Sequence, residues 1–377
     1  MMNVVWYSPY VLAADTGSGN IMLGWCEALA QQGADVTIIL DEQLRSRPAP
    51  KSVHCVALEH RRGGRLRTPK GMREHLGSAD VLVVQGGFVM WNIAAGREAG
   101  AAGVPYLVVP QGAYDERLVD RRPIRKRVWN MLLERRYLAS ALGVHVHHES
   151  ELGGLRRLGV SLPAVILPNG IGAYQENRWD GGSGGYLLYL GRFDVYVKAL
   201  DILVRSLTHL PERARPILRL HGPDQRGGKR EVAKLVGDLG LERWIVVGEP
   251  IYGDEKWKAI TQAAGCVYPS RRDAWSMAVT EAMGAGVPTL VADYPLGRLL
   301  AEEGAALLCD RTPEGVALGI ERLLSEEGRE AARRGASLAT GRLSWDALAS
   351  SWLEQVSRLL HEEGSTSGEQ RVPLNDM

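Results

Sequence analysis

The chain has 377 residues, of which 45% are hydrophobic and 24% are charged, and its formal net charge is +1. This length is sufficient for two domains with substantial cores, and the composition is that of a globular protein. The near-zero net charge gives no global attraction to nucleic acid, and no apolar run reaches the roughly 20 residues that a membrane-spanning helix needs.

The cysteines and the first residues indicate a reducing compartment. Cys26, Cys55, Cys266 and Cys309 have no C-x-x-C spacing, so the sequence indicates neither a zinc site nor a disulfide framework. The N-terminus lacks the charged and long apolar segments of a signal peptide. We therefore expect a cytoplasmic protein.

Short apolar runs alternate with amphipathic segments along the whole chain. In the first half, strands are predicted at residues 4–7, 36–40, 81–84, 106–109, 143–146 and 165–167. In the second half, they are predicted at residues 186–190, 217–220, 245–247, 266–268 and 289–291. Strands that are regularly separated by helices predict an α/β protein with parallel sheets.

The same pattern suggests a division into domains. Residues 1–171 form the predicted first domain and residues 172–341 the second, with a glycine-rich run at 181–185 that is typical of a flexible linker. Residues 342–361 have the apolar spacing of a last amphipathic helix. The polar tail at 362–377 is predicted to be disordered.

A glycine-bearing loop follows the first strand and precedes a predicted helix at 21–31. Gly17 and Gly19 in this loop would allow backbone N–H groups to approach an anion closely. A dinucleotide fingerprint would need a third glycine where Met22 stands, so a nicotinamide cofactor is not indicated. The loop is interpreted either as an anion-binding loop or as a plain strand-to-helix turn.

Residues 117–129 form one dense basic segment with interleaved apolar residues. Such a segment fits a solvated helix face, a peripheral contact with an anionic membrane, or a site for a phosphorylated acceptor. Its aromatic residues are too sparse for a nucleic-acid platform. We therefore predict no nucleic-acid partner.

Metal chemistry is not favoured by the sequence. The chain contains no Asp-x-Asp pair, the motif with which many transferases hold a metal ion. His145, His147 and His148 share one predicted strand with no further ligand nearby in sequence, so ordinary strand histidines are favoured over a metal site.

A pair of cations lies at the turn after the strand at 186–190. The chain turns on Gly191, presents Arg192 and then opens a helix with Lys198. A planar guanidinium and a point charge suit a diphosphate whose charge grows as it leaves. A surface Arg and Lys at a helix start are the alternative interpretation.

Two carboxylates flank the junction between the strand at 266–268 and a predicted helix at 276–283. Asp273 lies at the strand exit beside the helix N-terminus, and Glu281 lies about two turns further on. A carboxylate near a helix N-terminus repels phosphate, so Asp273 is interpreted as an acceptor for sugar hydroxyls. The pair also fits a capping Asp and a surface Glu.

The segment at 268–288 resembles the signature of the retaining GT-B glycosyltransferases of family 4. In that signature two Glu residues, with seven residues between them, follow Pro-Ser and precede Ala-Met-x-x-Gly-x-Pro; here they are Asp273 and Glu281. Gly-Arg followed by Lys is the other family signature, matched by Arg192 and Lys198, and its usual Lys-Gly reads Lys198-Ala199 here. The resemblance extends over residues 3–360.

The resemblance implies a GT-B fold, in which two Rossmann-like domains face a cleft and the last helix crosses back to the first domain. Glu281 is then expected to hold the ribose, Asp273 the sugar hydroxyls, and Arg192 with Lys198 the diphosphate. The Gly17 and Gly19 loop would face the diphosphate. The further donor-site residues implied by family position are Gln111, where many relatives have His, and Trp275, Ser276 and Met277, near the usual Gly-Phe-Gly.

The reaction implied is metal-independent transfer of a hexosyl unit from an NDP-sugar, expected to be a UDP-sugar, to an acceptor hydroxyl with retention. No bound cofactor is expected, because the nucleotide sugar is a co-substrate. The acceptor is a carbohydrate, a lipid-linked molecule or a small molecule, in cell-envelope or natural-product glycosylation. A GT-B epimerase or phosphorylase and a non-catalytic nucleotide-sugar-binding subunit are the alternatives.

Overall fold

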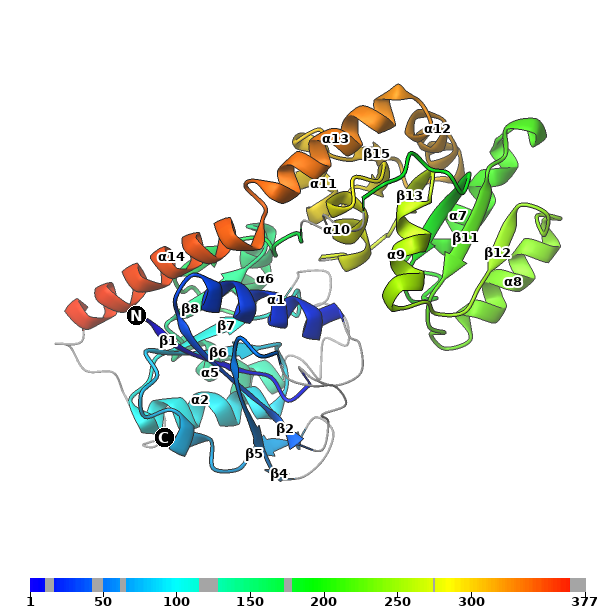
Figure 1. Cartoon of the computed structure of the whole chain (residues 1–377). Helices are drawn as coiled ribbons and strands as arrows, with labels where there is room; N and C mark the ends of the chain where they lie inside the picture. Colours follow the sequence, from blue (N-terminus) through cyan, green and yellow to red (C-terminus); the bar gives the residue numbers. More distant parts are fainter. Residues whose placement is uncertain are drawn as a thin grey trace. The chain divides into compact units, whose positions relative to one another are not determined.

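The computed structural model of the chain describes residues 1–10, 17–42, 50–61, 66–114, 128–172, 178–273 and 275–366. The chain divides into two compact units, each with a hydrophobic core (Figure 1). Unit 1 consists of Met1–Gly170 and Trp345–Met377, and unit 2 consists of Ile171–Ser344.

Unit 1 is built on a parallel sheet. Within its described residues, seven strands pair in the order β3-β2-β1-β6-β7-β8-β9. Their bounds are β1 (Asn3–Tyr7), β2 (Asp35–Asp41), β3 (His54–Leu58), β6 (Val81–Gln85), β7 (Tyr106–Val109), β8 (Gly143–Val146) and β9 (Ala164–Ile166). The chain runs outward from β1 to β3 and returns on the other side at β6, so the strand order reverses between β1 and β6.

Helices cover both faces of this sheet. On one face lie α1 (Gly17–Gln31) and α14 (Trp345–Thr366), and on the other lies α2 (Met90–Ala102) (Figure 1). Because successive side chains of a strand point to opposite faces, Trp6 of β1 stacks on Trp352 of α14, with ring centroids 6.3 Å apart, whereas Tyr7 joins the core that contains Ile93 of α2.

The shorter elements of unit 1 connect the strands. They are α5 (Arg135–Ala139), α6 (Ser150–Arg157), the 3₁₀ helix η3 (Met72–His75), the π-helical turn η4 (Asn130–Glu134), and the antiparallel pair β4 (His60–Arg61) and β5 (Thr68–Pro69).

Unit 2 has the same plan. Its described residues form a six-stranded parallel sheet in the order β12-β11-β10-β13-β14-β15, which reverses between β10 and β13. The strands are β10 (Tyr186–Leu190), β11 (Ile217–His221), β12 (Ile245–Val247), β13 (Gly265–Tyr268), β14 (Thr289–Ala292) and β15 (Leu307–Cys309). The helices are α7 (Leu200–Ser206), α8 (Gly228–Asp238), α9 (Gly253–Thr261), α10 (Met277–Gly284), α11 (Pro295–Glu302), α12 (Pro313–Leu323) and α13 (Glu326–Thr340), with the 3₁₀ turns η5 (Leu207–His209) and η6 (Glu212–Ala214).

The glycine-rich run at 181–185, expected to be a flexible linker, is instead an ordered turn inside unit 2. Asp180 accepts hydrogen bonds from the backbone N–H groups of Gly182 and Ser183, each at 3.0 Å, and Gly184 donates to the carbonyl of Gln262 at 2.9 Å. Composition alone was misleading here, because the glycines serve a tight turn into β10.

Both chain ends of unit 2 lie together. Ile171 donates its N–H to the carbonyl of Leu343 at 2.8 Å and forms a parallel bridge with Ser344. The last helix, α14, begins directly afterwards at Trp345 and belongs to unit 1. It continues to Thr366, beyond the expected start of the tail at 362, and the rest of that tail lies outside the described residues.

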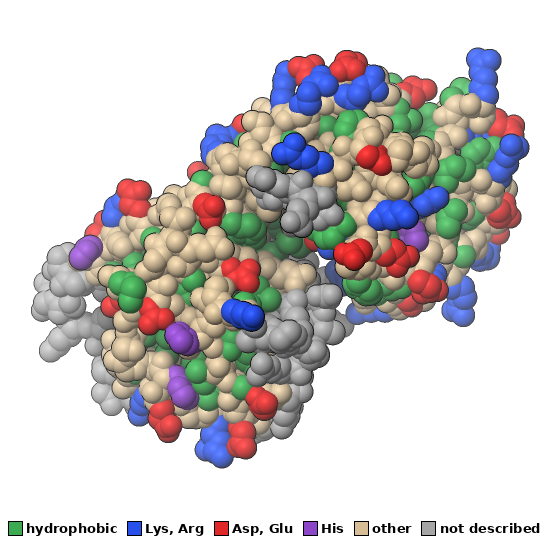
Figure 2. All heavy atoms as spheres, in the orientation of Figure 1, with side chains coloured by type: hydrophobic (Ala, Val, Ile, Leu, Met, Phe, Trp, Pro, Cys, Tyr) green, Lys and Arg blue, Asp and Glu red, His purple; other side chains and the backbone are tan. Residues whose placement is uncertain are grey.

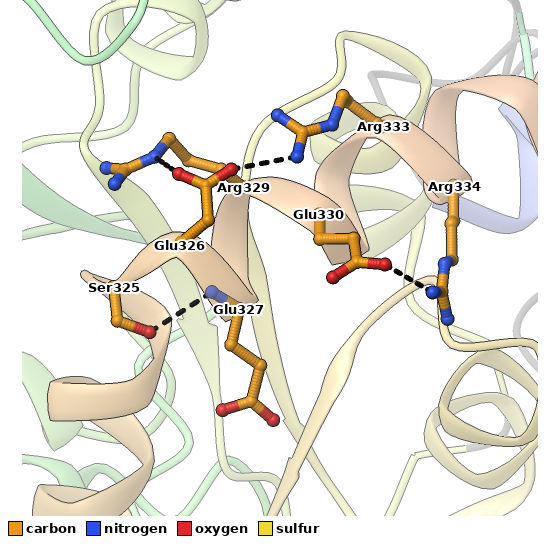
Figure 3. Close-up of polar contacts among 7 residues, drawn as sticks. All are labelled: Ser325, Glu326, Glu327, Arg329, Glu330, Arg333 and Arg334. Atoms are coloured by element: carbon orange, nitrogen blue, oxygen red, sulfur yellow. Dashed lines mark hydrogen bonds and ion pairs between the residues drawn. The ribbon is translucent and has the colours of Figure 1, made fainter.

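The surface of α13 carries paired charges (Figure 3). Glu326 accepts hydrogen bonds from Arg329 at 2.7 Å and Arg333 at 2.8 Å, and Glu330 pairs with Arg334. In the view of Figure 2, basic and acidic side chains are likewise intermixed on the described surface. The pairing of opposite charges is consistent with the formal net charge of +1.

Candidate active site

The point at which the strand order of unit 2 reverses brings two predicted site residues into contact. Ligands of open parallel sheets bind at such a point, outside the carboxyl ends of the strands. Lys198 follows β10 and Asp273 follows β13, the two strands that flank the reversal. Lys198 Nζ lies 2.5 Å from Asp273 Oδ2, and the two side chains are only 15% and 12% exposed.

The loops that carry this pair are fixed to each other. Arg271 forms two parallel hydrogen bonds to the carboxylate of Asp201, each 2.7 Å long, and its backbone N–H donates to the carbonyl of Val197 at 3.0 Å. A bidentate Arg–carboxylate contact is directional. Both loops are therefore held in register before any ligand binds.

Ala199 stands where the family usually has glycine, and its backbone explains that preference. Its φ angle is +55°, in the left-handed region, and its side chain is buried. A non-glycine residue costs about 1–2 kcal/mol in this conformation. The chain therefore keeps the backbone turn that presents Lys198 although it lacks the glycine.

Arg192 lies at the exit of β10 with an exposed side chain. Its backbone carbonyl accepts a hydrogen bond from the hydroxyl of Tyr189 at 3.0 Å. At Gly191 a Cβ would lie 2.6 Å from that hydroxyl, so a larger residue would displace the Tyr189 ring. Within the described part of the chain, the guanidinium of Arg192 makes no ion pair, so it is available to an anionic ligand.

Glu281 lies in the middle of α10 and is 9% exposed. Its Oε1 accepts a hydrogen bond from Nζ of Lys256 at 2.8 Å. Lys256 belongs to α9, the helix before β13. Sequence reasoning missed this residue, because a lysine on an amphipathic helix outside the motif has the pattern of an ordinary surface charge.

Asp273 does not cap α10. The N-cap of that helix is Ser276, whose side chain makes no capping hydrogen bond. Ser276 is buried, and its neighbours Trp275 and Met277 are half-buried. These three residues stand between Asp273 and Glu281 in the sequence, at the start of α10.

Tyr294, which follows β14, is a further side chain near Asp273 that the sequence did not single out. Burial raises the pKa of its hydroxyl well above the ordinary value, and the charge of Asp273 raises it further. The hydroxyl is buried and makes no hydrogen bond to any residue that the structure describes. A buried polar atom that has no partner and that feels the charge of Asp273 needs an explanation, and a role in the candidate site is one.

In unit 1, the predicted residues follow β1 and β7 along the chain. Gly17 and Gly19, which were expected in a loop before a helix at 21–31, lie instead in the first turn of α1, because the helix already begins at Gly17. Gln111 follows β7 with a φ angle of +51°, and its side-chain Nε2 is buried without a partner among the described residues. A left-handed glutamine with an unpaired amide is a strained arrangement of the kind found at binding sites.

The next residue, Gly112, is held by Glu151 of α6. The carboxylate accepts from the N–H of Gly112 at 3.1 Å and from that of His147 at 2.9 Å. Burial alone would raise the pKa of Glu151, but the hydrogen bonds from His147 and Gly112 outweigh it and lower the pKa. Glu151 therefore stabilises the loop that carries Gln111.

Of the three predicted strand histidines, only His145 lies within β8, and it has structural partners. His145 is fully buried, its Nε2 bonds the carbonyl of Leu167 at 3.0 Å, and its ring lies edge-on to Trp25 with centroids 5.0 Å apart. Burial lowers its pKa to about 3. Among the residues that the structure describes, no group of three or more His, Cys, Asp or Glu could hold a metal ion.

Two family models match this chain, one in each half. The model described as a glycosyl transferase 4-like domain matches residues 16–170, and the model described as glycosyl transferases group 1 matches residues 184–326. The chain belongs to the family 4 glycosyltransferases of GT-B type. Like other members of this family, it has the two parallel-sheet α/β domains described above.

Curated relatives match over part of their length. A D-inositol 3-phosphate glycosyltransferase from Xylanimonas cellulosilytica is 27% identical over 171 residues, which are 45% of this chain and 41% of the relative. An uncharacterised glycosyltransferase from Methanocaldococcus jannaschii is 28% identical over 147 residues, or 38% and 36% of the two chains. The matches therefore span about two fifths of each relative's length.

Solved structures share the fold over nearly the whole chain. Sucrose-phosphate synthase from Thermosynechococcus elongatus superposes with a TM-score of 0.72, at 18% identity, over 96% of this chain and 100% of that one. HepE from Anabaena, in complex with UDP and glucose, gives a TM-score of 0.72 at 12% identity, over 95% and 100% of the two chains. At these identities the likeness shows the fold alone.

A peripheral membrane contact was one of three interpretations of residues 117–129, and residues 117–127 lie outside the described part of the chain. In the described part, no helix has the length and apolarity to cross a bilayer.

Proposed function

We propose that this glycosyltransferase moves a hexosyl unit from a UDP-sugar to an acceptor hydroxyl with retention of configuration. The observation that carries the proposal is the contact of Lys198 with Asp273 at the strand-order reversal of unit 2, 2.5 Å between Nζ and Oδ2. The UDP and glucose in the Anabaena structure, which has the same fold, support the choice of donor. We further propose a cytoplasmic location, a carbohydrate, lipid-linked or small-molecule acceptor, and a role in cell-envelope or natural-product glycosylation.

The charges of the site fit a leaving diphosphate. Arg192 is exposed and makes no ion pair in the described part of the chain, and Lys198 can exchange the carboxylate of Asp273 for a phosphate oxygen. Each charged hydrogen bond to the diphosphate would contribute about 1.5–3 kcal/mol. Asp273 is then released to accept hydrogen bonds from the sugar hydroxyls.

In the proposed reaction, the bond between the sugar C1 and the β-phosphate oxygen breaks as the acceptor oxygen bonds to C1. The acceptor proton passes to the departing phosphate oxygen, because no described side chain stands out as a dedicated base. Arg192 and Lys198 stabilise the growing charge on the diphosphate, as preorganised cations do in a partly dehydrated site. No metal ion or bound cofactor is required in this scheme.

The first experiment measures thermal unfolding with UDP, UDP-glucose, UDP-galactose, GDP-mannose and ADP-glucose. A ligand at 100 times its Kd adds about 2.7 kcal/mol of stability, so the correct nucleotide should raise the melting temperature. Sugar transfer is then assayed with inositol phosphate, the acceptor that the name of the Xylanimonas relative suggests, and with a panel of carbohydrate, lipid-linked and small-molecule acceptors. Excess EDTA in the assay tests whether transfer needs a metal ion. The anomeric configuration of the product is read by NMR.

Calorimetry on variants tests the assignment of the cations. Arg192→Ala and Lys198→Ala should each weaken UDP binding by about 1.5–3 kcal/mol. Unchanged UDP affinity in both variants contradicts the assignment. UDP binding without turnover on any acceptor would identify a binding subunit, and donor hydrolysis or phosphorolysis without an acceptor would identify the epimerase or phosphorylase alternative.

A further inference from the structure

Lys256 lies outside every family motif quoted above, yet it contacts one of the motif carboxylates. Its Nζ donates to Oε1 of Glu281 at 2.8 Å, and the two side chains are 24% and 11% exposed. The same Nζ lies 4.9 Å from the ring centroid of Trp257, its neighbour in α9. The two helices that flank β13 thus bring an ammonium group onto a carboxylate that is almost buried.

Only one oxygen of Glu281 is used by this contact. Among the residues that the structure describes, Oε2 of Glu281 accepts no hydrogen bond. A carboxylate has acceptor capacity on both oxygens, so Oε2 retains its full capacity for a ligand. Vicinal hydroxyl groups, such as the 2′- and 3′-hydroxyls of a ribose, are donors that match a free carboxylate oxygen.

Fixing Glu281 in advance has an energetic consequence. A free glutamate side chain has several rotatable bonds, and immobilising such a side chain on binding costs conformational entropy. An ion pair that already fixes the side chain in the unliganded protein removes much of that cost. Because the pair is largely shielded from water, it is screened less than an exposed surface pair.

We propose that Lys256 is a positioning residue for nucleotide recognition: it holds Oε1 of Glu281 so that Oε2 receives the ribose hydroxyls of the donor. The inference rests on the proposed function, since it takes a nucleoside diphosphate as the ligand of unit 2. Lys256 acts through Glu281 and does not itself contact the nucleotide.

The test compares UDP with its 2′,3′-dideoxy analogue, which lacks both ribose hydroxyls, by calorimetry on the full chain. The variants are Lys256→Met, Lys256→Arg, Glu281→Gln, and the double variant with Lys256→Met and Glu281→Gln. Lys258→Met is the matched control, because Lys258 is an exposed lysine of the same helix. Melting temperatures verify that each variant is folded.

We expect wild type to prefer UDP over the dideoxy analogue by about tenfold or more, the effect of one charged hydrogen bond. Lys256→Met should lose about tenfold in UDP affinity while its affinity for the analogue stays within about twofold. Lys256→Arg should restore most of the preference for UDP, and Lys258→Met should match wild type. In the Glu281→Gln background, Lys256→Met should have little further effect, because the two residues act as one unit.

Three results overturn the inference while the proposed function stands. One is a wild-type preference for UDP that Lys256→Met leaves intact. Another is an equal loss of affinity for UDP and for the analogue, which would show that Lys256 acts on the phosphates or only on stability. The third is an undiminished effect of Lys256→Met in the Glu281→Gln background. If wild type binds no nucleoside diphosphate, the proposed function fails and the inference fails with it.

Discussion

The two acidic residues of the motif have different partners, and this difference predicts different phenotypes. Asp273 pairs with Lys198 and Glu281 pairs with Lys256. Asp273→Asn frees Lys198 for the diphosphate, so UDP affinity should be unchanged or higher. Turnover should fall about 10²-fold, as for a contact that strengthens in the transition state.

Calorimetry and steady-state kinetics check this prediction, with Asp238→Asn, which removes an exposed carboxylate of α8, as the control. Glu281→Gln should instead weaken UDP and UDP-sugar alike. Weaker UDP binding in Asp273→Asn, or near-normal turnover, would contradict the separate roles given to the two carboxylates.

His145 makes the stability of unit 1 depend on pH. Its folded-state pKa is lowered from 6.5 to about 3 by burial. The unfolded chain binds a proton at a higher pH than the folded chain, so the stabilisation is complete above 6.5 and is lost as the pH falls towards 3. The loss is about 1.4 kcal/mol per pH unit, or about 2 kcal/mol at about pH 5.

Urea denaturation at several pH values measures this effect. His145→Gln should be less stable than wild type near neutral pH, and the difference should shrink on acidification. His54→Gln, at an exposed position of β3, should keep the wild-type pH dependence. Parallel stability curves for wild type and His145→Gln would show that His145 does not titrate as its burial implies.

At the scale of single elements, α13 allows the stabilisation by an N-cap to be compared with that by an exposed ion pair (Figure 3). The hydroxyl of Ser325 accepts the N–H of Glu327 at 3.2 Å, and Glu330 pairs with Arg334 on the exposed surface. Ser325→Ala should cost about 1 kcal/mol, whereas Glu330→Ala should change stability by less than about 0.5 kcal/mol, because exposed pairs are screened by water. Thermal unfolding measures both, and a larger loss for Glu330→Ala would reverse the ranking.

The sequence predicted most strands of both sheets, because their apolar runs and punctuation are clear. It missed β3 and β15. The first begins with His54 and Cys55, which have no alternating pattern. It also took the ordered turn at 181–185 for a linker, since composition does not reveal the hydrogen bonds from Asp180.

The sequence predicted only those residues of the candidate site that carry a local signal. Arg192, Lys198, Asp273 and Glu281 carry a local signal, because each stands at a fixed distance from a strand end. Lys256 and Tyr294 carry none, since their nearness to the carboxylates arises from the packing of α9 and from the exit of β14. Contacts between residues that are distant in the sequence can be found only once the fold is known.

At the scale of the whole molecule, unit 1 depends on the last helix of the chain. Trp352 of α14 is fully buried against Trp6 of β1. Trp352→Ala should lower the free energy of unfolding of unit 1 by about 3–5 kcal/mol, while unit 2 keeps its stability and its response to UDP. Calorimetric unfolding with and without UDP resolves the two transitions, and Glu354→Ala, exposed on the same helix, is the control. A common shift of both transitions would mean that the units unfold together.

The hydrogen bond between Ile171 and Leu343 has a consequence for the evolution of this chain. Because the first and last residues of unit 2 meet there, unit 2 is an insertion into a loop of unit 1, between β9 and α14. A module whose ends meet can be exchanged without a long new loop, so the entropy of loop closure changes little. The corresponding unit of another family 4 enzyme can therefore be grafted at two adjacent junctions, and the two units can evolve separately.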